Sequence, residues 1–173
     1  MRRVSGPILT LPVVTILLTI MPAWGAAPEG TDSGLTAMFV RYYGAIQKGR
    51  WKDAFDLLHD RLKEATQVST PEDLARRSSR TQQELIAAFL KHDRLEVAKT
   101  ELDLTSIKAR VTGAGDGDVA GQVSYDLVVF PKGAGRALMY RVVLDVGLSQ
   151  GRIIRITQES MTRIDPGALG DAV

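Results

Sequence analysis

The spacing of apolar residues changes after His92, and this change restricts the chain to a fold with helices first and a sheet afterwards. Before His92, apolar residues recur at helical spacing, as in the stripe Leu35, Met38, Phe39, Tyr42 and Ile46. After it, they alternate with polar residues, most regularly at Leu138, Tyr140, Val142, Leu144, Val146 and Leu148. Alternation indicates strands with one buried face. We therefore expect an α+β domain with three N-terminal helices packed on a curved antiparallel sheet of four to five strands.

The three expected helices lie between Ser33 and His92. The first carries the stripe above and ends at Lys48-Gly49-Arg50, and the second continues the pattern with Trp51, Ala54, Phe55, Leu58 and Leu62. The third begins at Thr70-Pro71-Glu72-Asp73, where threonine can cap the helix, proline fits its first turn and the acids favour its positive end. It continues to about Leu90, and Ser78-Ser79 is where it could break.

The strands are separated by short turn-forming segments, which favour antiparallel hairpins. These segments are Gly113 to Asp118, Pro131 to Gly135 and Ser149 to Gly151. The alternation changes parity near Thr105-Ser106, which predicts a bulge or turn there. The last strand runs from Arg152 to about Met161. We expect Phe39, Tyr42, Leu144 and Ile156 to share a single core.

The first 25 residues have the three-part plan of a secretory signal. Arg2 and Arg3 precede an uncharged apolar run that ends at Ala23-Trp24-Gly25. We expect cleavage after Gly25, export by the general secretory route, and a periplasmic or secreted protein; the alternative is an uncleaved N-terminal anchor. Residues 26–33 would then form a flexible spacer, 34–162 one α+β domain, and 163–173 a disordered tail.

Composition excludes several kinds of site. The chain has no cysteine, so it can form neither a disulfide nor a thiolate metal site, and no cysteine is present for lipid attachment. It has 22 Lys and Arg against 20 Asp and Glu, and loss of Arg2 and Arg3 with the signal would leave a neutral domain. Neutral charge without a broad basic run gives no reason to expect a nucleic-acid partner. We expect no cofactor and no metal.

From about Leu35 to Met161, the chain resembles the nuclear transport factor two-like superfamily, which includes the SnoaL and ketosteroid isomerase-like proteins of the cystatin-like cone fold. The resemblance rests on Phe39-Val40-Arg41-Tyr42-Tyr43, on Gly49-Arg50-Trp51-Lys52-Asp53-Ala54-Phe55 with Leu57-Leu58, and on the closing Gly151-Arg152-Ile153-Ile154-Arg155-Ile156. It implies a cone-like fold with a pocket between helices and sheet. It also implies that a homodimer could form through the sheet.

Active members of this superfamily place carboxylates and a tyrosine in that pocket for proton transfer. The corresponding inner-face tyrosines here would be Tyr42, Tyr125 and Tyr140, and with Phe39 they form our candidate ligand pocket. No carboxylate is expected on the same face, since Asp126 and Asp145 fall on the opposite parity. We therefore predict no catalytic residue, and the tyrosines could equally be core residues with the hydroxyl at a rim.

Three polar motifs have both a functional and a structural interpretation. His59-Asp60 could be a base and its orienting acid, but adjacent helical residues do not face each other. Asp116-Gly117-Asp118 could bind calcium, but it lacks the oxygen ligands of a calcium loop and is better explained as a hairpin turn. Arg76, Arg77 and Arg80 could bind an anionic lipid surface or an acidic partner, although nearby acids partly balance them.

The sequence leaves three hypotheses of function. The first is an exported, non-catalytic accessory domain that binds a small apolar ligand or a protein partner. The second is an isomerase-like or dehydratase-like enzyme that uses the pocket between helices and sheet, which only the resemblance supports. The third is an interaction module tethered to the membrane by an uncleaved N-terminus.

Overall fold

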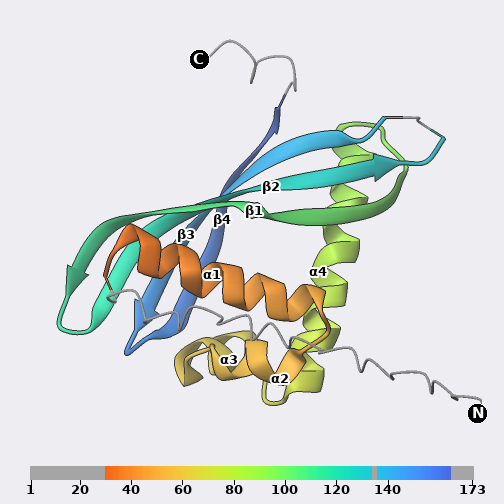
Figure 1. Cartoon of the computed structure of the whole chain (residues 1–173). Coiled ribbons are helices and arrows are strands. Elements are labelled where there is room, and N and C mark those ends of the chain that lie inside the picture. The colour runs from red at the N-terminus through yellow and green to blue at the C-terminus, as the bar shows by residue number, and fades with distance from the viewer. Residues whose placement is uncertain (1–29, 134–135, 165–173) are drawn as a thin grey trace, which may run out of the picture.

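The computed structural model describes residues 30–133 and 136–164, which form an α+β fold with helices followed by an open four-stranded antiparallel sheet (Figure 1). The helices are α1 (Asp32–Gln47), α2 (Trp51–Asp56), α3 (Asp60–Thr66) and α4 (Pro71–His92). The strands are β1 (Val97–Gly115), β2 (Asp118–Pro131), β3 (Leu138–Ser149) and β4 (Arg152–Ile164). The expected signal peptide, its cleavage site and most of the expected tail lie outside the described residues.

Both long helices begin at side-chain caps. The Thr70 hydroxyl accepts a hydrogen bond from the Asp73 backbone N–H, and the Asp73 carboxylate accepts one from the Thr70 N–H, which confirms the predicted start of α4. The helix continues through Ser78-Ser79 without a break. Thr31 caps α1, so this helix begins at Asp32, within the segment expected to be a spacer.

The helix expected over Trp51 to Leu62 is two helices, so the structure has four helices among its described residues where we expected three. The chain leaves the helix after Asp56 because it pairs with the edge of the sheet. The Ile153 N–H donates to the Leu57 carbonyl and the His59 N–H donates to the Ile153 carbonyl, each at 2.9 Å. This bridge fixes the α2–α3 junction against β4.

The sheet has the simple order β1-β2-β3-β4, with each strand antiparallel to the next. The register of β1 against β2 shifts between Asp103 and Lys108, which confirms the predicted irregularity near Thr105-Ser106. The β1–β2 hairpin turns at Asp116 and Gly117, both with positive φ. Phe39, Tyr42 and Leu144 are buried in one core, as predicted, whereas Ile156 is only partly buried and packs against that core.

Helix α1 lies along the free edge of β1 and supplies hydrogen-bond partners to it. The Ala109 N–H donates to the Thr36 hydroxyl at 3.1 Å, and the Val111 N–H donates to the Asp32 carboxylate at 2.7 Å. The Gln47 amide donates to the Leu102 carbonyl at 2.6 Å. These contacts satisfy backbone groups that an edge strand otherwise leaves unpaired. They also fix α1 relative to the sheet.

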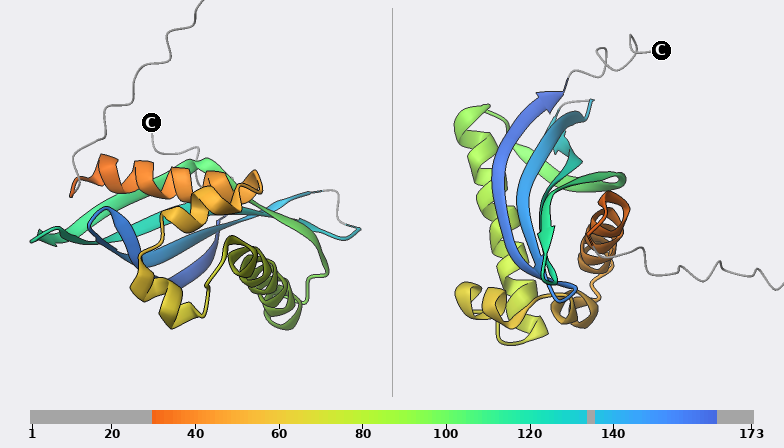
Figure 2. Two further views of the ribbon diagram at one scale, coloured as in Figure 1. Left: turned by 90° about the horizontal axis from the view of Figure 1, so that it is seen from below. Right: turned by 90° about the vertical axis from the view of Figure 1, so that its left-hand side faces the viewer.

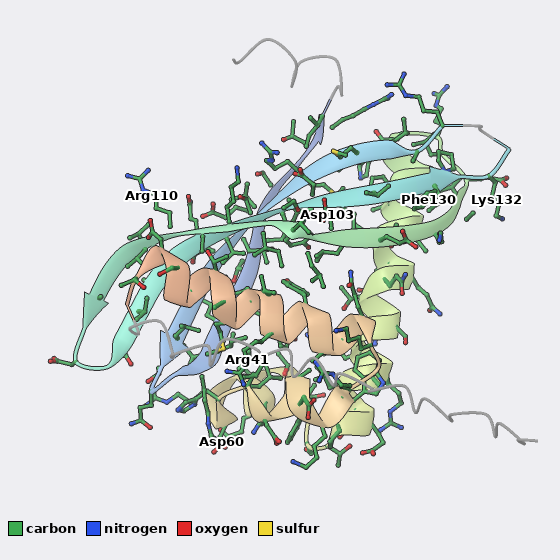
Figure 3. All side chains as sticks on the ribbon, in the orientation of Figure 1. Arg41, Asp60, Asp103, Arg110, Phe130 and Lys132 are labelled. Atoms are coloured by element: carbon green, nitrogen blue, oxygen red, sulfur yellow. The ribbon has the colours of Figure 1, made fainter. Side chains whose placement is uncertain are left out.

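The helices do not cover the sheet uniformly. α1 and α4 lie apart, and α2 contacts both of them (Figure 2). The opposite face of the sheet carries ion pairs between neighbouring strands. Arg141 forms a two-point ion pair with Asp126, and Arg155 pairs with Asp145. Figure 3 shows Arg110 projecting from β1 on the side away from α1.

Candidate functional site

A cleft of about 920 Å³ lies between the four helices and the sheet. Its sheet side is formed by Leu102, Leu127 and Ile156, which come from three different strands. Apolar side chains from every helix and from Leu58, which lies between α2 and α3, complete the wall; the helical ones include Ile46, Trp51, Leu62, Leu74 and Leu85. The volume lies in the range of pockets that bind small organic molecules, and such pockets are mostly apolar with a few polar groups.

Tyr42 supplies one of these polar groups. Only 7% of the residue is exposed, yet its hydroxyl has no hydrogen-bond partner within the described residues, and the side chain lines the cleft. Its hydroxyl oxygen is not among the fully buried unpaired atoms, so it keeps some contact with solvent. Burial raises the pKa of Tyr42 to about 12, and the nearby Arg77 guanidinium partly offsets this rise. The hydroxyl is therefore a hydrogen-bond donor at any physiological pH.

Arg77 lines the same cleft from α4. Its guanidinium donates to the Thr66 carbonyl at the end of α3, at 3.1 Å, and in the described part of the chain it has no carboxylate partner. The other cleft residue with a charge is Glu101, which already accepts a hydrogen bond from Lys99 at 2.6 Å. The cleft therefore contains an unpaired positive charge.

The structure separates the three arginines that the sequence groups together. Arg76 pairs with Asp73, and Arg80 pairs with Glu84, both on the exposed side of α4. Arg77 alone of the three lines the cleft. Residues on a helix point about 100° apart from one position to the next, so neighbours in the sequence face different surroundings.

The candidate pocket residues Phe39, Tyr42, Tyr125 and Tyr140 are only partly brought together. Phe39 is fully buried and Tyr125 is half-buried, and with Tyr42 and Tyr43 they form an aromatic cluster between α1 and β2. Of the four candidates, Tyr42 lines the cleft. Tyr43 also lines it; the sequence placed this residue off the main apolar stripe, so periodicity gave no reason to select it.

Tyr140 lies elsewhere, beneath the end of α4. Its ring packs on Phe89 with centroids 4.7 Å apart, and its hydroxyl donates to the Asp93 carboxylate at 3.2 Å. Burial and this carboxylate both raise the pKa of Tyr140. Asp93 itself is exposed, so the pair differs from a buried acid beside a tyrosine in a pocket.

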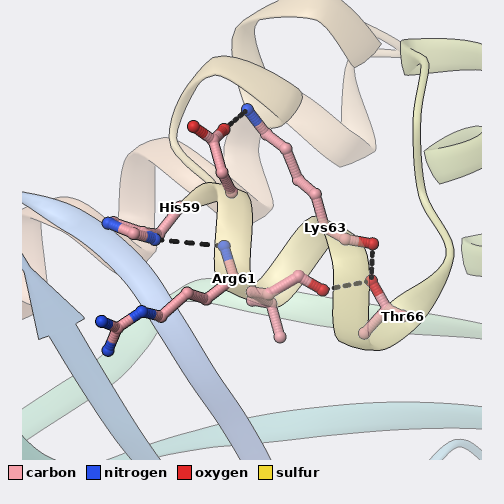
Figure 4. Close-up of polar contacts among 6 residues, drawn as sticks. His59, Arg61, Lys63 and Thr66 are labelled. Carbon is pink, nitrogen blue, oxygen red and sulfur yellow. Dashed lines mark hydrogen bonds and ion pairs between the residues drawn. The ribbon is translucent and has the colours of Figure 1, made fainter.

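His59 and Asp60 take structural roles at the start of α3. The His59 imidazole Nδ1 accepts a hydrogen bond from the Arg61 backbone N–H at 3.2 Å, and Asp60 pairs with Lys63 at 3.1 Å (Figure 4). Neither contact joins the two residues to each other, as a base and its orienting acid would require. Across residues 30–133 and 136–164, no group of three or more His, Asp or Glu side chains is placed to hold a metal ion.

Comparison of the chain with models of protein families, with curated proteins and with solved structures gives no match. The resemblance to the nuclear transport factor two-like superfamily therefore stays a prediction. Within the described ranges, no helix combines the length and the apolar character that a membrane span needs.

Proposed function

We propose that this domain binds a small, largely apolar molecule in the cleft between its helices and its sheet. The observation that supports this most directly is the apolar wall of a cleft of about 920 Å³, which includes side chains from all four helices and three strands. Filling it would remove apolar surface of the ligand and of the protein from water, at about 25 cal/mol per Å². Together with the expected signal peptide, this supports an exported ligand-binding protein of cone-like, nuclear transport factor two-like fold.

Trp51 offers a reporter of binding inside the cleft. The chain has two tryptophans, and the other, Trp24, lies in the expected signal peptide. In the full chain carrying Trp24→Phe, tryptophan fluorescence comes from Trp51 alone, which lines the cleft. We expect the neutral dye N-phenylnaphthylamine to bind with saturation and to accept excitation energy from Trp51. Absence of saturable binding would contradict the proposal.

A matched pair of substitutions on α4 separates the cleft from the general surface. Leu85 is half-buried and lines the cleft, whereas Leu90 is 53% exposed and does not line it. We expect Leu85→Glu to weaken dye binding about tenfold or more, because a charge replaces part of the apolar wall. Leu90→Glu should leave binding within twofold of the parent. Equal effects of the two variants would place the dye outside the cleft.

An isomerase-like or dehydratase-like enzyme receives less support from the arrangement of side chains. Active members of the superfamily that the chain resembles transfer the proton with a carboxylate next to the reacting atoms. Glu101 lines the cleft, but it is exposed and paired with Lys99, and Asp93 bonds Tyr140 outside the cleft. We therefore favour binding without catalysis.

A further inference from the structure

We propose that the ligand carries one anionic head group, and that Arg77 and the Tyr42 hydroxyl bind this head while the apolar wall binds the rest of the molecule. The inference rests on the proposed function and adds the chemical class of the ligand: an apolar body with a single carboxylate or a similar acid. Two polar groups support it, the Tyr42 hydroxyl on α1 and the Arg77 guanidinium on α4, which belong to residues that line the same cleft. Among the described residues, the hydroxyl has no hydrogen-bond partner and the guanidinium has no carboxylate partner.

The first of these groups is the Tyr42 hydroxyl. Tyr42 is 7% exposed, and a residue so buried normally has its polar atom hydrogen-bonded, because an unpaired buried donor loses its bond to water without replacement. The Tyr42 hydroxyl has no hydrogen-bond partner within residues 30–133 and 136–164, and it belongs to a residue that lines the cleft. Because it stays protonated, it can donate to an oxygen of a ligand.

The second group is the Arg77 guanidinium. Four of its five N–H donors remain after the bond to the Thr66 carbonyl, and no acid in the described part of the chain neutralises it. A planar guanidinium matches the two oxygens of a carboxylate, and such charge-assisted hydrogen bonds are stronger than neutral ones. The Ser78 and Thr81 hydroxyls, which also line the cleft and have no hydrogen bond among the described residues, add further donors on the same helix.

The charge of the cleft favours an anion over a cation or a neutral head. Glu101 is paired with Lys99 and therefore does not neutralise Arg77. A ligand cation would meet an unpaired Arg77, and an uncharged ligand would leave both Arg77 and Tyr42 without a charged acceptor. An acid of the stated class satisfies both groups and places its apolar part against Leu102, Leu127 and Ile156.

Two dyes that differ by one acidic group test this inference. Anilinonaphthalene sulfonate has the apolar body of N-phenylnaphthylamine and adds a sulfonate. In the full chain carrying Trp24→Phe, we expect the anionic dye to bind at least about tenfold more tightly than the neutral dye, which corresponds to about 1.4 kcal/mol. Decanoate should displace it at lower concentration than decanol does. Tighter binding of the neutral dye, or equal displacement by acid and alcohol, would overturn the inference.

Substitutions then identify the residues that cause the preference for the anionic dye. Arg77→Met should bring the two dye affinities to within about twofold of each other and leave binding of the neutral dye unaffected. The control Arg80→Met, on the exposed side of the same helix, should keep the preference for the anionic dye. Tyr42→Phe should weaken the anionic dye about three- to tenfold, and Tyr140→Phe should not, since Tyr140 lies outside the cleft. An unchanged preference in Arg77→Met would overturn the assignment.

The parent protein gives a measurement that does not depend on the folding of any variant. Added salt should weaken the anionic dye and leave the neutral dye nearly unchanged, because salt screens the charge of an exposed guanidinium. If salt affects both dyes equally, the head group is not held by charge and the inference fails. If neither dye binds, the proposed function fails, which is a different result.

Discussion

Replacing Gly121 by alanine tests how closely α1 packs on the sheet and therefore how firmly one wall of the cleft is placed. A Cβ atom at Gly121 would lie 2.6 Å from Leu35 Cδ2 on α1 and 2.7 Å from the Arg110 carbonyl oxygen on β1. Both distances are shorter than real contacts of a Cβ atom. Leu35 can shift only within a full core, and the carbonyl belongs to the backbone of a paired strand, so neither contact is relieved without cost.

The expected loss of stability can be worked out from these contacts. Overpacking of a filled core costs about 1–3 kcal/mol. Alanine restricts the unfolded chain more than glycine does, which returns about 0.4–1 kcal/mol. Because the new Cβ atom would meet two atoms at once, we take the upper end of the first range and expect Gly121→Ala to lower the free energy of unfolding by about 2 kcal/mol. Gly113→Ala is the matched control, because Gly113 lies in β1 with no atom within 4 Å of its Cβ position.

Urea unfolding followed by circular dichroism measures both variants, and a double-mutant cycle with Leu35→Ala separates the two contacts. Removing Leu35 should make Gly121→Ala about 1 kcal/mol less costly, because one clashing atom is gone, while the clash with the Arg110 carbonyl remains. If Gly121→Ala is as stable as Gly113→Ala, α1 does not pack on β2 at the distance described, and the wall of the cleft lies elsewhere.

Two further predictions concern Tyr42 and the edge of β1. Because burial raises the pKa of Tyr42 from 10.0 to about 12, the unfolded chain loses this proton first, so its contribution to stability is complete below pH 10 and falls as the pH rises towards 12. The fall reaches up to about 3 kcal/mol, since one pKa unit corresponds to about 1.4 kcal/mol. Stability should therefore fall more steeply at alkaline pH in the parent than in Tyr42→Phe, which keeps the raised pKa values of Tyr43 and Tyr125. Parallel curves would refute the burial of the Tyr42 hydroxyl. Thr36→Val keeps the shape of the side chain but leaves the Ala109 N–H unpaired, which should lower stability by about 1–2 kcal/mol in urea unfolding. Ser33→Ala should cost less, because the Ser33 hydroxyl makes an exposed hydrogen bond to the Thr31 hydroxyl.

The local pattern of the sequence predicted the type and order of the elements. The hairpins, the irregularity near Thr105-Ser106 and the start of α4 at Thr70 all depend on residues close together in the chain. Alternation and helical spacing report which residues share a face, and caps and turns depend on a few neighbouring side chains. These features are therefore readable without knowledge of the fold.

The break between α2 and α3 illustrates what such patterns miss. The apolar stripe continues from Trp51 through Leu58 to Leu62 as if one helix ran through it. The chain departs from the helix because Leu57 and His59 bond to Ile153, almost a hundred residues later. A contact with a distant strand leaves no periodic signal near the break.

In the candidate site, too, some features followed from the local sequence and others only from contacts between distant elements. The sequence by itself determined that Tyr42 and Tyr140 are inner-face residues and that Arg76, Arg77 and Arg80 lie close together on one helix. Only the tertiary structure decided that Tyr42 and Arg77 line one cleft, that Tyr140 bonds to Asp93 away from it, and that Arg76 and Arg80 are neutralised on the exposed side. The physical reason is that periodicity fixes the face of an element on which a residue lies, whereas the packing of distant elements fixes what that face meets.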